Sequence, residues 1–298
     1  MSFQITTASL DSEGYSYWPA PAKLNLELRV LGQRDDGYHE LQTLFQLLDY
    51  GDDIWIKSND TGRLSLQSEY DEVPSADNLI IKAAKALAPY NSQALGADIK
   101  LHKKLPSGAG LGGGSSDAAT TLIALNHLWK LGLDNQTLCD IGSKLGADVP
   151  VFVNGYSAWA QGIGEVLTKT ELPEKWYLIV YPNVHINTGK IFSHSALTRN
   201  DKPIKLRATR QGQYVETQLE ELGYNAIQPL VAELYPEVNE ALNVLSQYGQ
   251  ALLTGTGSCV FLSFDNEREV RKISALCKQR WLTLVAKGIN RSPLLEIA

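Results

Sequence analysis

The stretch of this sequence best suited to chemistry is a glycine-rich loop, LPSGAGLGGGSSDAA, at residues 105–119. Glycines let the backbone approach an anion closely, and they permit positive φ angles that point successive N–H groups inward. A helix beginning near Ser115 would add its free N–H groups and the positive end of its dipole. The loop therefore predicts a phosphate cradle, in which Ser115 and Ser116 donate hydroxyl groups to phosphate or bind Mg²⁺. The alternative is a flexible turn with a Ser or Asp helix cap.

Two other nucleotide-binding motifs fit this loop less well. Gly108, Gly110 and Gly113 satisfy G-x-G-x-x-G, and Asp134 follows at about the spacing of a dinucleotide-binding motif. The strand that enters such a motif is buried and continuously apolar, whereas the segment here is IKLHKKLP. A P-loop fails because no G-K-[ST] follows. A dinucleotide-dependent oxidoreductase stays open as the weaker alternative.

A lysine lies just upstream of the loop on an apolar strand face. Residues 97–105 alternate as a strand, and Lys103 falls on the same face as Ile99 and Leu101. An inward lysine needs an anionic partner, because an unpaired buried charge is costly. Lys103 is therefore a second candidate for phosphate binding.

A proton acceptor and a further cation can also be identified. Asp148, in LGADVPVF, is a carboxylate that could accept a hydroxyl proton, but Pro150 fits equally well with Asp148 as a helix N-cap. Residues 22–31 alternate as a half-buried strand with Lys23 and Asn25 on its polar face, which is usually a solvated face. From the residues alone, both interpretations of these side chains stay open.

Composition limits the class of protein. The chain has 298 residues, 44% hydrophobic residues and a net charge of −6, which argues against a general nucleic-acid binder. Three cysteines without metal-ligand spacing predict buried, reduced thiols. With no signal-like segment and no long apolar run, we expect a cytoplasmic protein without a membrane span, and a poorly ordered extension over residues 1–17.

Strand and helix patterns predict an α+β protein of two domains, with residues 1–172 and 173–298 divided near ELPEKW. A hairpin is expected around Gly162 and Gly164. Residues 41–56 read as strand interrupted by a Gly-Asp turn.

Three blocks of this sequence together resemble a known family. PSGAGLGGGSSDAA is similar to the P-x-x-x-G-L-G-S-S-x-A phosphate loop of the GHMP kinases, and PAKLNLEL and LLTGTGSCVF fit the same family in order and spacing over essentially the whole chain. The resemblance implies a ribosomal protein S5 domain 2-like ATP-binding domain and a ferredoxin-like C-terminal domain. It also implies ATP with Mg²⁺, held by the phosphates and a loop serine. The implied ATP-binding residues are Asn78, Leu79, Lys103, Pro106, Ser107, Gly108, Ala109, Gly110, Leu111, Gly112, Gly113, Gly114, Ser115 and Ser116.

The resemblance also assigns roles at the acceptor side of the site. It implies that Asp148 is the catalytic base, that Lys23 keeps Asp148 ionised and stabilises charge on the alcohol oxygen, and that Asn25 positions the substrate. Asn78 as a plain helix cap stays an alternative to a role in ATP binding.

The blocks AKLNLELRVLGQRDDGYHELQTLFQLLDYGD and GADVPVF are most similar to the branch of the family that phosphorylates the 2-hydroxyl of a cytidine diphosphate sugar alcohol for isoprenoid synthesis. Tyr38 and Phe192 would stack on the cytosine, with His39 reading its edge and Thr188 nearby. Core packing of Tyr38 and Phe192 is the alternative. The expected partners are therefore two small molecules, with no nucleic acid, and the protein is expected to be a monomer or a weak homodimer. A kinase of the family with another small alcohol substrate stays open.

Overall fold

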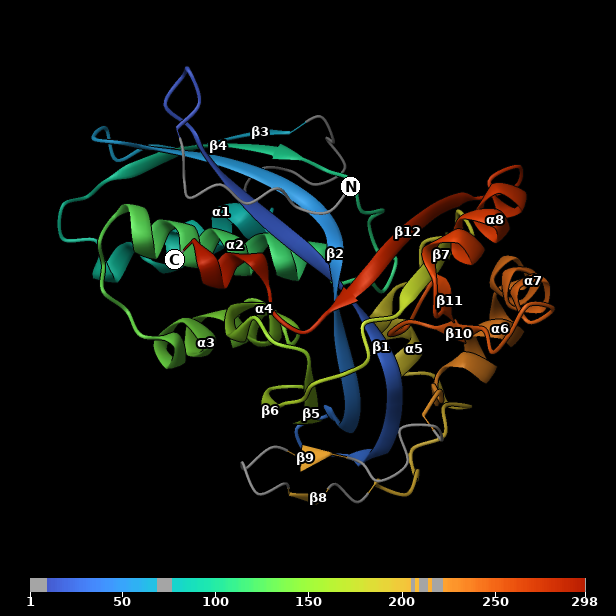
Figure 1. Cartoon of the computed structure of the whole chain (residues 1–298). Coiled ribbons are helices and arrows are strands. Elements are labelled where there is room, and N and C mark those ends of the chain that lie inside the picture. Colours follow the sequence, from blue (N-terminus) through green and yellow to red (C-terminus); the bar gives the residue numbers. More distant parts are fainter. Residues whose placement is uncertain (1–9, 69–76, 205–206, 209–213, 216–221, 298) are drawn as a thin grey trace.

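The structure of the protein is a computed structural model that describes residues 10–68, 77–204, 207–208, 214–215 and 222–297 (Figure 1). Helices and strands are mixed along the whole chain, as the α+β class requires. The strands are β1 Ser16–Gln33, β2 His39–Asn59, β3 Leu64–Ser68, β4 Gly96–His102, β5 Ala158–Gly162, β6 Val166–Lys169, β7 Trp176–Tyr181, β8 Arg207–Ala208, β9 Tyr214–Val215, β10 Leu252–Leu253, β11 Val260–Phe264 and β12 Leu282–Ile289. The helices are α1 Leu79–Ala86, α2 Gly113–Leu128, α3 Asn135–Ser143, α4 Val149–Asn154, α5 Thr188–Phe192, α6 Gln228–Leu234, α7 Pro236–Leu245 and α8 Glu267–Cys277, with short 3₁₀ turns at Ala88–Tyr90 and Pro293–Glu296.

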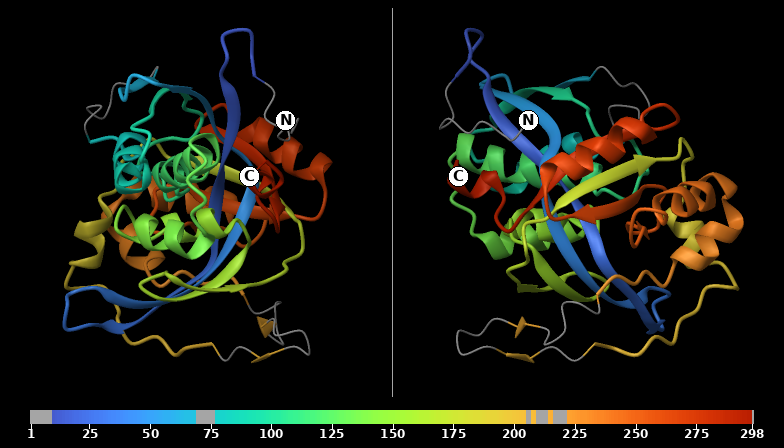
Figure 2. Two further views of the ribbon diagram at one scale, coloured as in Figure 1. Left: turned by 90° about the vertical axis from the view of Figure 1, so that its left-hand side faces the viewer. Right: turned by 45° about the vertical axis from the view of Figure 1, so that its right-hand side comes forward.

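Within the described residues, ten strands form one sheet in which β2 is the central connection. The main path runs β10-β11-β7-β12-β2-β4-β3, and β1 and β5 also pair with β2. Helices α1 to α4 gather at one end of this sheet and α6 to α8 at the other, with the long β1–β2 hairpin passing between them (Figures 1 and 2). A site along this hairpin can therefore receive side chains from both halves of the chain.

The β1–β2 hairpin differs from the sequence prediction in one respect. The strand β2 continues unbroken through Gly51 and Asp52, so the turn predicted within residues 41–56 is wrong. The glycine serves close strand approach instead, because a Cβ at Gly51 would overlap the carbonyl group of Ala20 on β1.

Strand β1 is buried on both faces, so its predicted half-buried character is also wrong. Lys23, Asn25 and Glu27 are buried as well as the apolar face. The covering segments are loops: the backbone N–H of Lys23 donates to the Leu111 carbonyl, and that of Asn25 donates to Oγ1 of Thr254. Polar side chains of β1 thus point into a protein-lined space rather than into solvent.

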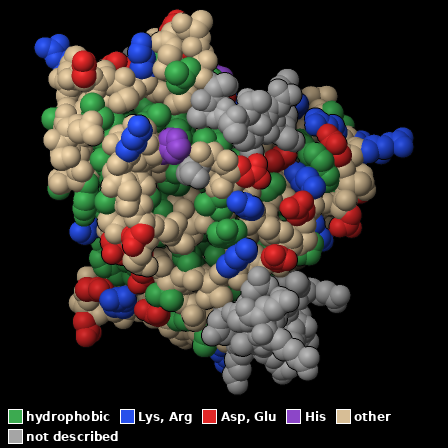
Figure 3. Space-filling view, turned by 60° about the vertical axis from the view of Figure 1, so that its left-hand side comes forward, with side chains coloured by type: hydrophobic (Ala, Val, Ile, Leu, Met, Phe, Trp, Pro, Cys, Tyr) green, Lys and Arg blue, Asp and Glu red, His purple; other side chains and the backbone are tan. Residues whose placement is uncertain are grey.

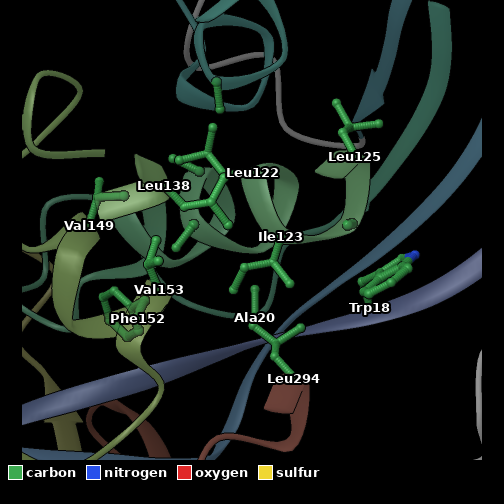
Figure 4. Close-up of a cluster of buried hydrophobic side chains, with 14 of the residues drawn as sticks. Trp18, Ala20, Leu122, Ile123, Leu125, Leu138, Val149, Phe152, Val153 and Leu294 are labelled. Atoms are coloured by element: carbon green, nitrogen blue, oxygen red, sulfur yellow. The ribbon is translucent and has the colours of Figure 1, made fainter. Parts of the chain in front are cut away.

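Two large hydrophobic clusters lie on either side of the hairpin. The first joins β1, α2 and α4, and it includes Trp18, Leu122 and Phe152 (Figure 4). Leu294, near the end of the chain, also packs into this cluster, whereas the second cluster joins β7, β11, α7 and α8. The division of the chain at residue 172 stays a prediction.

Several smaller expectations can be compared with the structure. The hairpin around Gly162 and Gly164 is confirmed by antiparallel pairing of β5 with β6, and the three cysteines are buried free thiols. Disorder through residue 17 is wrong for Ser16 and Tyr17, whose backbones pair with Ile56 and Trp55; residues 1–9 lie outside the described part. In that described part, every helix is too short or too polar to cross a membrane.

Candidate active site

One cavity gathers nearly all the residues that the sequence predicts to bind substrates. Its volume of about 930 Å³ lies in the range of small-molecule sites. The predicted residues that line it are Lys23, Asn25, Tyr38, His39, Asn78, Leu79, Lys103, Pro106, Ser107, Gly108, Ala109, Gly110, Leu111, Gly112, Gly113, Gly114, Ser115, Asp148, Thr188 and Phe192. The face drawn in Figure 3 carries acidic and basic side chains interspersed over its described part, in keeping with the net charge of −6.

The glycine loop forms one wall of the cavity and leads into α2. Gly108, Gly110 and Gly112 have φ values of +62°, +77° and +74°, which favour glycine. The helix begins at Gly113, two residues before the predicted Ser115, with Gly112 as its N-cap. No side chain caps this helix, so its first N–H groups remain directed along the loop, as an anion site requires.

The two serines at the start of α2 differ in their surroundings. Ser115 is partly exposed and lines the cavity, whereas Ser116 is fully buried and does not line it. The reason is the helix period, because consecutive residues point about 100° apart. The structure therefore does not bring the Ser116 hydroxyl to the cavity, and Ser115 is the serine that could contact phosphate or Mg²⁺ there.

Close packing against Thr254 and Phe152 holds the glycine loop in place. A Cβ at Gly110 would overlap the Thr254 carbonyl oxygen, and one at Gly112 would lie 2.8 Å from the Phe152 ring. Cys259 also donates its backbone N–H to the Ala109 carbonyl at 3.1 Å. The loop is thus fixed between α4 and the segment at Thr254 that joins β10 to β11. This packing disagrees with the alternative of a flexible turn.

Lys23 and Asp148 form an ion pair on the cavity wall. Nζ of Lys23 lies 3.3 Å from Oδ2 of Asp148, and the Lys23 side chain is 3% exposed against 33% for Asp148. The same ammonium group donates to Oδ1 of Asn25 at 2.7 Å and to the Gly110 carbonyl at 2.8 Å. The pair therefore places a fixed cation beside a partly open carboxylate at the wall of the cavity.

Asp148 occupies the N-cap position of α4, but its side chain caps no backbone N–H group. The helix-cap interpretation, which the sequence left open, is therefore not supported by the contacts. The carboxylate instead lines the cavity beside the Lys23 ammonium group. Such a group is free to accept a proton from a bound hydroxyl.

Lys103 finds its anionic partners within the protein. Its Nζ lies 2.6 Å from Oδ2 of Asp52 and 2.8 Å from Oδ2 of Asp117. Oδ1 of Asp52 accepts the backbone N–H groups of Lys104 and Leu105 at 2.6 and 2.8 Å. The requirement for a phosphate partner, inferred from the inward direction of Lys103, is therefore removed, although Lys103 still lines the cavity.

These contacts shift the pKa values of this cluster. Burial opposes ionisation of Lys103, but the carboxylates of Asp117 and Asp52 raise its pKa above the ordinary value. Burial raises the pKa of Asp117 to about 7, while the Lys103 ammonium acts against that rise. The cluster is therefore a network of ion pairs and hydrogen bonds that holds the segment leading into the glycine loop.

Asn78 and Leu79 also line the cavity. The Asn78 side chain accepts the backbone N–H of Ile80 at 2.9 Å and caps α1. Its helix-cap interpretation is thus present in the structure, and a contact of Asn78 with adenine stays a prediction.

The far end of the cavity is aromatic. Tyr38 is 59% exposed, whereas the neighbouring His39 is buried at 7%. The ring centroids of His39 and Phe192 lie 5.0 Å apart at an interplanar angle of 37°. Oγ1 of Thr188 hydrogen-bonds to Oγ1 of Thr256 at 2.8 Å. Exposure of Tyr38 disagrees with a core role for it, while Phe192 packs partly against the second hydrophobic cluster.

Some residues of this site were missed by sequence reasoning. Thr254 bonds to Asn25 and to the Gly110 carbonyl, and the block LLTGTGSCVF was the available signal for it. Asp117 directly follows the serine pair and could have been read as the partner of Lys103. No sequence signal pointed to Asp52, or to Arg199, whose Nε donates a hydrogen bond to Nε2 of His39.

Comparisons with known proteins agree with this geometry. The family of GHMP kinases N terminal domains matches residues 78–156, and that of GHMP kinases C terminal domains matches residues 207–280. The chain belongs to the GHMP kinase family and is a phosphotransferase that acts on an alcohol group. Its α+β fold is thereby confirmed, and the oxidoreductase alternative is wrong; Asp134, which that motif required, caps α3 through the Thr137 N–H.

Individual relatives indicate which kinases of the family this chain is similar to. The chain is 51% identical to the 4-diphosphocytidyl-2-C-methyl-D-erythritol kinase of Pseudomonas syringae pv. syringae, covering 93% of this chain and 95% of that protein. It is 50% identical to the kinase of the same name from Pseudomonas aeruginosa, with the same coverage. A crystal structure of 4-(cytidine 5'-diphospho)-2C-methyl-D-erythritol kinase superposes with a TM-score of 0.78 at 30% identity, over 91% of this chain and 98% of the other. The Methanococcus jannaschii mevalonate kinase, at 15% identity and a TM-score of 0.68 over 94% of this chain and all of that one, shares the fold.

Proposed function

We propose that this protein transfers the γ-phosphoryl group of ATP to the 2-hydroxyl of 4-diphosphocytidyl-2-C-methyl-D-erythritol, a step of non-mevalonate isoprenoid synthesis. The relatives with about half of their residues in common carry the name of this kinase. The observation that supports the chemistry best is the Lys23–Asp148 pair, which faces the cavity directly beside the glycine loop.

Asp148 is the catalytic base of this proposal. As the 2-hydroxyl oxygen forms its bond to the γ-phosphorus, its proton passes to the Asp148 carboxylate, and the bond from phosphorus to the β–γ bridging oxygen breaks to release ADP. Lys23 lies within reach of both Asp148 and Asn25. Its ammonium group acts as the electrostatic partner of Asp148 and stabilises negative charge on the attacking oxygen.

The phosphates of ATP lie in the glycine loop, against the free N–H groups at the start of α2. Among the described residues, no three His, Cys, Asp or Glu side chains are grouped to hold a metal ion. Mg²⁺ would therefore take its ligands from the ATP phosphates and the Ser115 hydroxyl. Bound there, it would neutralise charge on the phosphates during transfer.

The aromatic end of the cavity suits the cytosine of the acceptor. Tyr38 and Phe192 offer ring faces for stacking, and His39 offers its edge for hydrogen bonding. The adenine of ATP is assigned to the Asn78–Leu79 side. We also propose a cytoplasmic location, a monomer or weak homodimer, and a division into domains at residue 172.

Turnover of the purified protein with ATP tests the proposed function. We expect phosphorylation of the cytidyl substrate in preference to mevalonate, homoserine and galactose, and thermal stabilisation by ATP–Mg²⁺ but not by NAD(P). Preference for another alcohol would leave a GHMP kinase of different specificity. Stabilisation by NAD(P) without ATP would contradict the proposal altogether.

A further inference from the structure

Arg199, in the segment after α5, contacts the imidazole of His39. Its Nε donates a hydrogen bond to Nε2 of His39 at 2.8 Å. An arginine side chain has only donors and stays protonated, so Nε2 of His39 acts here as an acceptor. The imidazole is therefore neutral, and its single proton is on Nδ1.

The guanidinium group is itself held by backbone carbonyls. Nη1 donates to the Leu197 carbonyl at 2.9 Å, and Nη2 donates to the carbonyls of Phe192 and His194 at 2.8 and 2.9 Å. These bonds fix the direction of Nε. They also connect Arg199 to Phe192, whose ring packs on that of His39. The donor that faces His39 therefore cannot turn away without breaking several hydrogen bonds.

The surroundings of His39 favour this neutral form. Burial, together with the charge of Arg199, lowers the pKa of His39 below its ordinary value. Two further contacts of His39 are with uncharged residues: Phe192 packs against its ring, and Gln33 of β1 pairs with its backbone. A positive charge on His39 would face Arg199 at hydrogen-bond distance, with no described carboxylate among these contacts.

We propose that Arg199 sets the base specificity of this enzyme by locking His39 in the Nδ1–H tautomer. The imidazole lines the cavity, and in this tautomer it offers the bound base a single donor. That donor suits the N3 acceptor of cytosine, whereas it opposes the N3–H donor of uracil. Arg199 does not line the cavity, so it is a positioning residue that acts through His39. This inference rests on the proposed function, which puts a cytosine beside His39.

The tautomer can be measured in the wild-type protein without substrate. Long-range ¹H–¹⁵N spectra distinguish a protonated ring nitrogen from an unprotonated one, and His39→Gln identifies the signals. We expect Nδ1 to be the protonated nitrogen over the neutral pH range. A proton on Nε2, or an equal mixture of tautomers, would overturn the proposal.

The consequence for specificity is tested with the cytidyl substrate and its uridyl counterpart. In Arg199→Gln, the amide can either donate to Nε2 or accept from it, so both tautomers become possible. We expect the preference in kcat/KM for cytosine over uracil to fall roughly ten- to a hundred-fold, since a mismatched buried hydrogen bond is relieved. The matched control is Arg271→Gln, which removes an exposed pair with Glu267 on α8 and should keep the wild-type preference.

A loss of order around α5 would give a different result. It would lower kcat/KM for both substrates by the same factor and leave their ratio as in the wild type, and that ratio would overturn the proposal. Absence of turnover of the cytidyl substrate by the wild-type protein would instead count against the proposed function. In that case the tautomer measurement still tests whether Arg199 fixes His39 as the Nδ1–H tautomer, because it needs no substrate.

Discussion

Two lysines with little exposure flank the glycine loop, and their partners differ in exposure. Lys103 lies 2.6 and 2.8 Å from carboxylates that are 0% and 5% exposed, whereas Lys23 lies 3.3 Å from Asp148, which is 33% exposed. The first arrangement is closed, with short contacts on both sides of the ammonium group. The second leaves a carboxylate open to the cavity. The difference indicates that the Lys103 cluster anchors the loop, while the Lys23 pair is available for proton transfer.

The largest expected effect is on turnover by Asp148→Asn. This change keeps the size of the side chain and removes the base, so kcat should fall by about 10²–10⁴-fold. The melting temperature and the affinity for ATP should change little, because the Asp148 side chain caps no helix N–H group. Near-normal turnover would remove Asp148 from the chemistry.

Lys103→Met should act on stability rather than on the chemical step. It leaves Asp52 and Asp117 buried without their cation, and breaking such a buried pair costs about 3–5 kcal/mol. Denaturant unfolding measures the loss. The matched control is Lys104→Met, whose partly exposed pair with Asp53 should contribute less than about 1 kcal/mol. Equal losses in the two variants would contradict the anchor role of the cluster.

Glycine substitutions test how tightly the loop is held. Gly110→Ala puts a Cβ into the Thr254 carbonyl at a positive φ, a conformation that costs roughly 1–2 kcal/mol before any clash. The KM for ATP should therefore rise about tenfold or more. Gly114→Ala is the control, since its Cβ would meet only the Leu79 side chain at 3.5 Å. If both variants bind ATP as the wild type does, the loop is not the phosphate cradle.

Effects confined to one of the two substrates are expected at the aromatic end of the cavity. Tyr38→Ala and Phe192→Ala should each raise the KM for the cytidyl substrate by the equivalent of about 1–3 kcal/mol, with the KM for ATP unchanged. Tyr38→Ala should also keep the wild-type melting temperature, because Tyr38 is 59% exposed. Equal loss of both substrates would argue against base stacking.

The sequence predicted most of the site because its signals are local. A run of glycines before a serine pair indicates an anion cradle from backbone chemistry alone, and the resemblance to the GHMP kinases supplied Lys23 and Asp148. One of the two partners of Lys103, and the partner of His39, could not be predicted in this way. Asp52 and Arg199 lie 51 and 160 residues away from them in sequence, and their contacts depend on how strands and loops meet in three dimensions.

The errors in prediction have a similar cause. Gly51 reads as a turn in the sequence, but it lies inside β2, where the backbone of β1 at Ala20 comes too close for a side chain. The two serines look equivalent until the helix period turns Ser116 into the core. Polar residues on β1 suggested a solvated face, yet loops that are distant in sequence cover that face.

The central claim is that Lys23 and Asp148 act as one unit in phosphoryl transfer. A double-mutant cycle with Lys23→Met, Asp148→Asn and the double variant, measured as single-turnover rates with ATP and the cytidyl substrate, tests it most directly. Residues that act as a unit are strongly non-additive, so the double variant should be about as slow as the slower single variant. If the two losses of rate instead multiply, Lys23 and Asp148 act independently. That result would contradict the claim that their ion pair acts as one unit.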